Sequence, residues 1–123
     1  MKFDLKKIED IITPVITAMG YIVWSIDIER FKNRVLLRIN VDLPLGDERN
    51  GIGIDDCSEI SKQIGALLDV ENMIFGSYVL EVSSPGLNRS LRKREHFERY
   101  LNKVVRVVLK EPIDKQYNFV CKI

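Results

Sequence analysis

The short turn Ser84-Pro85-Gly86 constrains the fold more than any other segment, because it separates two differently patterned parts of the chain. Before it, residues 77–83 alternate as expected of a β-strand. Proline cannot continue a central strand, and glycine permits the positive φ of a type II turn. Four cations follow within six residues: Arg89, Arg92, Lys93 and Arg94. We expect a rigid turn that presents a cationic cluster between two folded units.

The first elements upstream are a helix and a hairpin. Apolar residues recur every three or four positions from Leu5 to Met19, after a possible N-cap at Asp4 and before Gly20, which suits a helix C-terminus. Pro14 predicts a kink or a break near Thr13. Residues 21–29 and 34–42 alternate in polarity around a short polar connection, which predicts an antiparallel hairpin.

Trp24 falls on the same face of the first strand as Ile22, Ile26 and Ile28. We therefore interpret it as a core residue and not as a platform for stacking bases. After the hairpin, residues 43–53 are rich in glycine and acidic residues and predict a mobile loop. They lack the lysine and hydroxyl residue of a phosphate-binding loop.

A second helix is predicted after Asp55, a possible N-cap, with an apolar stripe made by Cys57, Ile60, Ile64, Leu67 and Leu68. The order helix, strand, strand, helix, strand predicts an α+β domain. A crossover through the second helix places the last strand beside the hairpin, in a three-stranded sheet with both helices on one face. The pattern does not indicate which strand is central.

The overall net charge of +1 hides a strong asymmetry. Residues 1–82 hold 9 Lys and Arg against 14 Asp and Glu, whereas residues 83–123 hold 10 against 4. Such polarity permits a nucleic-acid partner, although charge runs often only solvate a surface. No apolar run is long enough to span a membrane, and the charged N-terminus differs from a signal peptide, so we expect a cytoplasmic protein.

Candidate catalytic and metal-binding residues are few. The single histidine, His96, would have to recruit Ser83 or Ser84 across the turn for nucleophilic catalysis, and the nucleophile-elbow motif is missing. One histidine with two distant cysteines makes no metal site. We expect no cofactor, no small-molecule substrate and no enzyme activity, and we interpret His96 as a packing or capping residue.

The segment Leu80-Glu81-Val82-Ser83-Ser84-Pro85-Gly86-Leu87, followed by Arg89, Leu91 and Glu95-His96-Phe97, closely resembles the RimP family of bacterial ribosome maturation factors. The resemblance extends back through Gly53-Ile54-Asp55-Asp56-Cys57 and residues 66–71. The chain departs from the family pattern at Asn88 and Ser90, where Asp and Pro are usual. The resemblance implies a non-catalytic assembly factor that binds the immature small (30S) ribosomal subunit through ribosomal RNA and a small-subunit protein.

The resemblance also implies that residues after the turn open a second domain, a small SH3-like β-barrel. About 30 residues are too few to close such a barrel, so we expect it to be truncated in this chain. We accordingly expect an N-terminal α/β domain at 1–88. Residues 89–123 would then form a linker, a short helix predicted at 94–101 and a partial C-terminal domain, with a turn at 111–114.

The candidate site consists of the signature turn and the cations after it. Its turn residues are Ser83, Ser84, Pro85, Gly86 and Leu87, and its partner- or RNA-binding residues are Arg89, Arg92, Lys93, Arg94, Arg99 and Lys103. Arginine and lysine neutralise phosphates. For Arg89 an internal role, holding the turn against Glu81 or a backbone carbonyl, is an equal alternative. A generic RNA-binding module or a protein–protein adaptor remains the alternative function.

Overall fold

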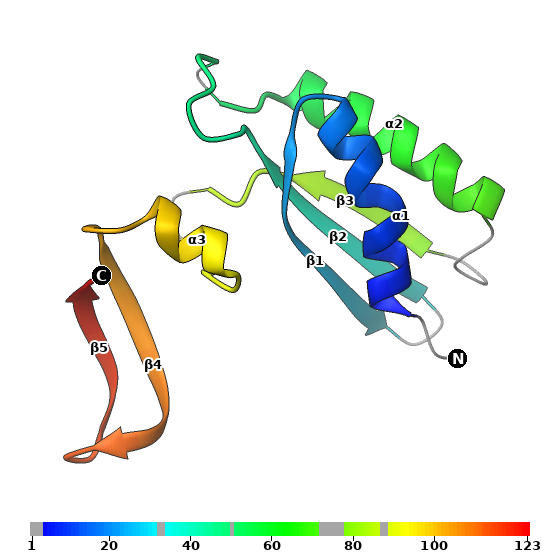
Figure 1. Cartoon of the computed structure of the whole chain (residues 1–123). Helices are drawn as coiled ribbons and strands as arrows, with labels where there is room; N and C mark the ends of the chain where they lie inside the picture. The colour runs from blue at the N-terminus through cyan, green and yellow to red at the C-terminus, as the bar shows by residue number, and fades with distance from the viewer. Residues whose placement is uncertain (1–3, 32–33, 50, 72–77, 87–88) are drawn as a thin grey trace. The chain divides into compact units, whose positions relative to one another are not determined.

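The structure, a computed structural model, describes residues 4–31, 34–49, 51–71, 78–86 and 89–123 (Figure 1). The chain divides into two compact units, Met1–Arg89 and Ser90–Ile123. The first unit contains α1 (Leu5–Ala18), β1 (Ile22–Phe31), β2 (Arg34–Asp42), α2 (Ile54–Glu71) and β3 (Tyr78–Ser83). The second contains α3 (Arg94–Arg99), β4 (Val104–Ile113) and β5 (Gln116–Lys122).

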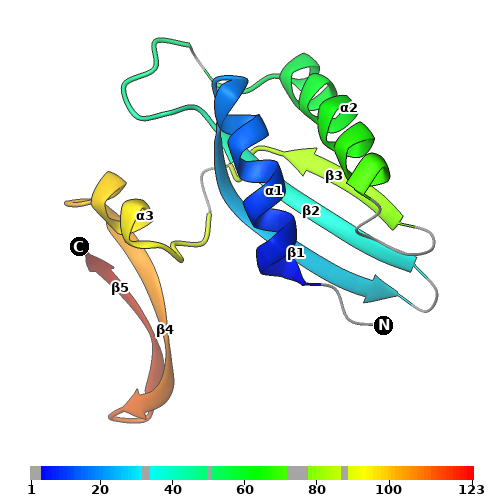
Figure 2. The same cartoon turned by 45° about the vertical axis from the view of Figure 1, so that its right-hand side comes forward.

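The first unit is a three-stranded sheet in the order β1-β2-β3, with α1 and α2 together on one face (Figures 1 and 2). Strand β2 is central. It pairs antiparallel with β1 and parallel with β3, because the crossover through α2 returns β3 to the second edge of β2. The predicted α+β architecture is confirmed, and the structure supplies the strand order that the pattern left open.

The core lies between the sheet and the two helices. Each element contributes one apolar stripe, and the fully buried members are Ile8, Ile12 and Ile16 of α1, Leu37, Ile39 and Val41 of β2, and Ile60, Ile64 and Leu68 of α2. Their spacing of three or four on the helices and two on the strand is the spacing that the sequence predicts. Burial of this apolar surface is the main stabilising contribution to the unit.

Helix α1 begins and ends as predicted. The Asp4 carboxylate accepts a hydrogen bond from the Lys7 amide at 3.1 Å, as an N-cap does. At the other end Gly20 has a φ of 97°, and the next amide, of Tyr21, donates to the Ile16 carbonyl at 3.2 Å. This is the Schellman pattern, in which a glycine supplies the left-handed residue.

The helix passes Pro14 without the break that the sequence allowed near Thr13. Proline removes one backbone hydrogen bond from a helix interior. Here Ile12 and Ile16, on either side of Pro14, are both fully buried. Packing of this face against the sheet holds the helix together across the proline, since tertiary contacts supply most helical stability in proteins.

Helix α2 begins at Ile54, two residues earlier than an Asp55 cap requires, so that prediction is wrong. The capping carboxylate is Asp56, whose Oδ2 accepts the Gly53 amide at 2.9 Å. Its Oδ1 accepts the Tyr21 hydroxyl at 2.6 Å, and this hydrogen bond is the main cause that lowers the pKa of Asp56. One side chain therefore both caps α2 and joins it to the residue that follows α1.

Arg49 ties the loop between β2 and α2 to the end of α1. Its Nη2 donates to the Gly20 carbonyl at 2.8 Å and to Asp47 Oδ2 at 2.9 Å. The guanidinium carbon lies 5.0 Å from the centre of the Tyr21 ring. The hydrogen bonds from Arg49 lower the pKa of Asp47 to about 2. The sequence predicted a mobile loop here and none of these contacts, because no pattern links residues so far apart.

In the second unit, α3 is followed by the antiparallel pair β4 and β5. The connecting turn is Asp114-Lys115, with φ of 50° and 64°, as in a type I′ turn. The turn predicted at 111–114 was therefore placed too early, and β4 runs through Pro112 to Ile113. The pairing is irregular between Val108 and Ile113, where an edge strand tolerates a proline. This two-stranded sheet agrees with the predicted partial barrel.

Candidate functional site

The signature turn leaves β3 directly at Ser83, whose hydroxyl donates to Asn40 Oδ1 on β2 at 3.1 Å. The Gly86 amide donates to the Ser84 hydroxyl at 3.4 Å, and Gly86 has a φ of 71°. The positive φ predicted for the glycine is confirmed. Apart from Gly86 itself and its chain neighbours, no atom of the described residues lies within 4 Å of a Cβ built on Gly86, so its backbone conformation requires glycine. Leu87 and Asn88 lie outside the residues that the structure describes.

Arg89 closes the turn and is held inside the first unit. Its Nε donates to the Gly86 carbonyl at 2.8 Å, and its Nη1 pairs with Asp42 Oδ2 at 2.5 Å. The guanidinium carbon lies 4.7 Å from the centre of the Trp24 ring, within cation–π range. Only 11% of the Arg89 side chain is exposed. This geometry matches the internal role left open for Arg89, with a backbone carbonyl as expected and Asp42 in place of Glu81.

Trp24 reaches this position because of a β-bulge in β1. The register shifts between Val23, which pairs with Val41, and Ser25, which pairs with Asn40. The extra residue, Trp24, is buried at 2% exposure but does not belong to the core cluster between sheet and helices. Its prediction as a buried residue is confirmed. Its placement on a common face with three isoleucines is wrong, because a bulge reverses the alternation of the strand.

A polar network covers the sheet face that carries no helix. Asn40 Nδ2 donates to the Ser25 hydroxyl at 2.9 Å, and the Ser83 hydroxyl donates to Asn40, so one row links the three strands. In the next row, Arg38 pairs with Glu29 on β1 at 3.3 Å and with Glu81 on β3 at 3.5 Å. The charges on this face are therefore largely compensated within it.

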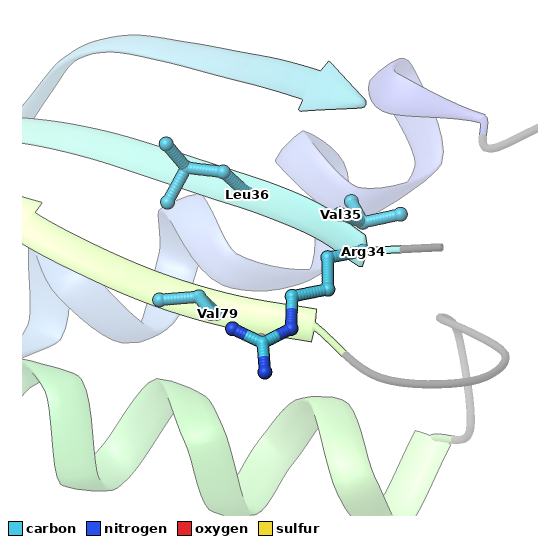
Figure 3. Close-up of a pocket in the computed structure, with 4 residues that line it drawn as sticks. All are labelled: Arg34, Val35, Leu36 and Val79. Carbon is cyan, nitrogen blue, oxygen red and sulfur yellow. The ribbon is translucent and has the colours of Figure 1, made fainter. Parts of the chain in front are cut away.

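The start of β2 and β3 forms a groove with a volume of about 280 Å³, lined by Arg34, Val35, Leu36 and Val79 (Figure 3). Figure 3 shows the Arg34 side chain extending toward Val79. Most of this lining is apolar, and carboxylates lie nearby on the same sheet face. Phosphate binding is favoured by several cations close together, and the lining of the groove contains one cation, Arg34, so the groove is a poorer nucleic-acid site than the basic residues after the turn.

The basic residues around α3 form an exposed cluster in the second unit. Arg92, Lys93 and Arg94 are all exposed, and we call them the basic cluster. The Arg94 side chain is 89% exposed and pairs with Glu98 at 2.9 Å. Such a solvent-exposed pair contributes little stability, so Arg94 can exchange Glu98 for a phosphate at small cost.

The other predicted cations lie in different settings. Arg99, in the last turn of α3, is half-buried, whereas Lys103 and Arg106 are exposed at the start of β4. The six predicted binding residues thus form no uniform set: Arg89 is a clamp of the first unit, and the exposed charge concentrates at residues 92–94.

His96 is the buried residue of α3, at 4% exposure, and it caps the helix from within. Its Nδ1 accepts the backbone amides of Arg92 at 2.9 Å and Lys93 at 3.2 Å. A ring nitrogen that accepts hydrogen bonds must be unprotonated. The interpretation of His96 as a capping residue agrees with these bonds, which engage the Nδ1 lone pair that a general base would need.

Phe97 is an exposed side chain of α3, at 45% exposure. Leu101, four residues later, is also exposed. The sequence indicates the exposure of Phe97 only indirectly. If His96 faces the buried side of the helix, the next residue along the chain must face another side.

Two further kinds of feature, a metal site and a membrane-spanning helix, are missing from the residues that the structure describes. Among them, no group of three or more His, Cys, Asp and Glu side chains is placed to hold a metal ion. Of the helices described, none is both long enough and apolar enough to cross a membrane.

The first unit is characterised by its order of elements, the turn after β3 and the Arg89 clamp. This sequence was compared with the models of known families. Residues 11–88 match the family model of the RimP N-terminal domain. The chain belongs to the RimP family. RimP proteins are ribosome maturation factors, so the family implies a role in ribosome maturation with a ribosomal partner. The matched RimP region includes the whole signature turn and ends at residue 88, and the basic cluster lies beyond it.

Proposed function

We propose that this chain is a non-catalytic assembly factor for the small (30S) ribosomal subunit, which binds the immature subunit in the cytoplasm through ribosomal RNA and a small-subunit protein. The observation that carries the proposal is the family match over residues 11–88, which implies ribosome maturation. The basic cluster supports the RNA contact, because three consecutive exposed cations suit a phosphate backbone.

The signature turn contributes to this function by holding the end of β3, from which the chain continues to the cluster. Arg89 belongs to this support and is not expected to bind RNA itself, since its guanidinium contacts Gly86, Asp42 and Trp24. For RNA contact we keep Arg92, Lys93 and Arg94, with Arg99 and Lys103 as flanking positions.

Co-sedimentation tests the proposal. The chain should sediment with small-subunit precursors and not with mature small subunits. Equal binding to both, together with equal binding to unrelated RNA, would instead favour a generic RNA-binding module. Binding to a ribosomal protein without any RNA would favour a protein–protein adaptor.

A further inference from the structure

We propose that Phe97 is a stacking platform for unpaired bases and that the basic cluster therefore takes single-stranded RNA. This inference rests on the proposed RNA-binding function and names the class of RNA that this surface binds. It combines three observations on α3: an exposed ring, cations next to that ring, and a buried histidine in the place where the ring would be expected.

The burial on α3 is reversed from the usual order. His96 is 4% exposed, whereas Phe97, the larger and more apolar side chain, is 45% exposed. A buried polar residue and an exposed large apolar residue are the informative exceptions in a folded protein. His96 is explained by its two hydrogen bonds to the amides of Arg92 and Lys93. Other large apolar side chains of this unit are exposed as well, such as Tyr117 at 47%, so Phe97 is distinguished by its position next to the basic cluster.

The helix places this ring beside cations. Arg94 lies three residues before Phe97 on α3, and residues at this spacing are neighbours on a helical surface; Lys93 is the N-cap residue of the same helix. Proteins that bind single strands combine cations that follow the backbone with aromatic rings on which bases stack. Because the Arg94–Glu98 pair is solvent-exposed, it does not prevent Arg94 from contacting a phosphate.

The ring distinguishes single strands from duplexes. In a duplex the faces of the bases are stacked on one another, so a protein ring cannot reach them without opening the helix. In a loop or an unpaired end the faces are free, and stacking adds a contribution that is independent of salt. The cations bind both forms of RNA, whereas Phe97 adds affinity for the single strand alone.

Affinity measurements on the full chain test the inference, with fluorescein-labelled oligouridine of about 12 nucleotides and an RNA duplex of similar length, over a series of salt concentrations. Phe97→Leu should weaken oligouridine binding about fivefold to a hundredfold. The slope of log affinity against log salt should stay unchanged, because stacking releases no counter-ions. Duplex affinity should not change, and Phe97→Tyr should bind like the native chain.

Tyr117 provides a matched control, because it is another half-exposed ring of the same unit, at 47% exposure on β5. Tyr117→Leu should leave both affinities unchanged. As a check that does not depend on substitution, 2-aminopurine placed in the oligouridine should lose fluorescence when the native chain binds, since stacking quenches it. No quenching would count against the inference even if Phe97→Leu failed to fold.

The inference is overturned if Phe97→Leu weakens single-strand and duplex binding equally, changes the salt slope, or has no effect on oligouridine. It is also overturned if Phe97→Leu impairs only co-sedimentation with precursor subunits, since the ring would then contact a protein. A different variant tests the proposed function. If the double variant Arg92→Ala with Arg94→Ala left RNA binding unchanged, the basic cluster would not be an RNA site.

Discussion

At the scale of single residues, the Arg89 guanidinium is held by the Gly86 carbonyl, the Asp42 carboxylate and the Trp24 ring. Arg89→Ala should lower the free energy of unfolding of the first unit by about 3 kcal/mol, because it leaves the mostly buried Asp42 carboxylate without this cation. Thermal or urea unfolding measures the loss. The fluorescence of Trp24, the one tryptophan of the sequence, should change as well.

Arg94→Ala is the matched control for Arg89→Ala. It removes the same side chain from an ion pair, but this pair is exposed, so the expected change is within about 0.5 kcal/mol. If both variants unfolded at the same denaturant concentration, the clamp at Arg89 would contribute nothing beyond a surface charge. The double variant of Arg89→Ala with Asp42→Asn should recover part of the loss, since the buried charge is then removed.

The interaction of Asp47 with Arg49 predicts that the stability of the protein depends on pH. Hydrogen bonds from Arg49 lower the pKa of Asp47 from the ordinary value of 3.8 to about 2. The charged form is thus favoured in the folded state. Its contribution to stability is fully present above the unfolded-state pKa and is lost as the pH falls from about 4 toward 2. The melting temperatures of the native chain and of Asp47→Asn should converge over this range. A constant difference between them would show that Asp47 does not titrate in this way.

The residue contacts of the site were only partly predictable from the sequence. A carbonyl partner for Arg89 was expected, because a turn places its own carbonyls near the next side chain. Asp42 was not, since it lies 47 residues away, and only the pairing of the strands brings it near. Trp24 was predicted to be buried but on the wrong face, because alternation continues through a bulge that no residue type marks.

At the scale of elements, His96 ties the start of α3 to the residues before it. Its Nδ1 accepts the amide of Lys93, the N-cap residue, and the amide of Arg92, which precedes the helix. His96→Ala should cost about 1 kcal/mol, the usual contribution of a helix cap, and should speed amide exchange in residues 94–99. Exchange in β2 should not change.

Glu95→Gln is the control for the histidine, because it changes an exposed neighbour in the same helical turn. It should leave the exchange of α3 nearly unaltered. Unchanged exchange in His96→Ala would mean that the two amides find other acceptors and that the histidine is a packing residue only.

The elements were predicted better than their ends. Apolar periodicity identified α1, α2 and the three strands of the first unit, because each packs one face against the core and the spacing of that face is fixed by geometry. The start of α2 was missed by two residues, because the capping contact comes from Asp56 inside the first turn, whose carboxylate accepts the Gly53 amide. The β4–β5 turn was missed because Pro112 suggested an end to the strand, whereas an irregular edge accommodates it.

At the scale of the whole molecule, the charge asymmetry along the sequence becomes a division between two units. The acidic part forms the sheet unit, whose open face neutralises its own charges through Arg38, Glu29 and Glu81. The basic part begins at the unit boundary after Arg89. The sequence predicted this polarity, but not that Arg89 belongs to the first unit, because its role depends on contacts that exist only after folding.

This division predicts where the salt dependence of RNA binding resides. Arg92→Ala with Arg94→Ala should reduce the slope of log affinity against log salt by roughly one to two, since each phosphate contact releases about 0.7 counter-ions from a single strand and about 0.9 from a duplex. All RNA sequences should be weakened alike, because phosphates carry no base identity. Lys115→Ala with Lys122→Ala on the hairpin removes the same charge from other exposed positions and is the matched control. If the control pair reduced the slope as much as the cluster pair, binding would follow net charge alone, and the residues after the turn would have no special part in it.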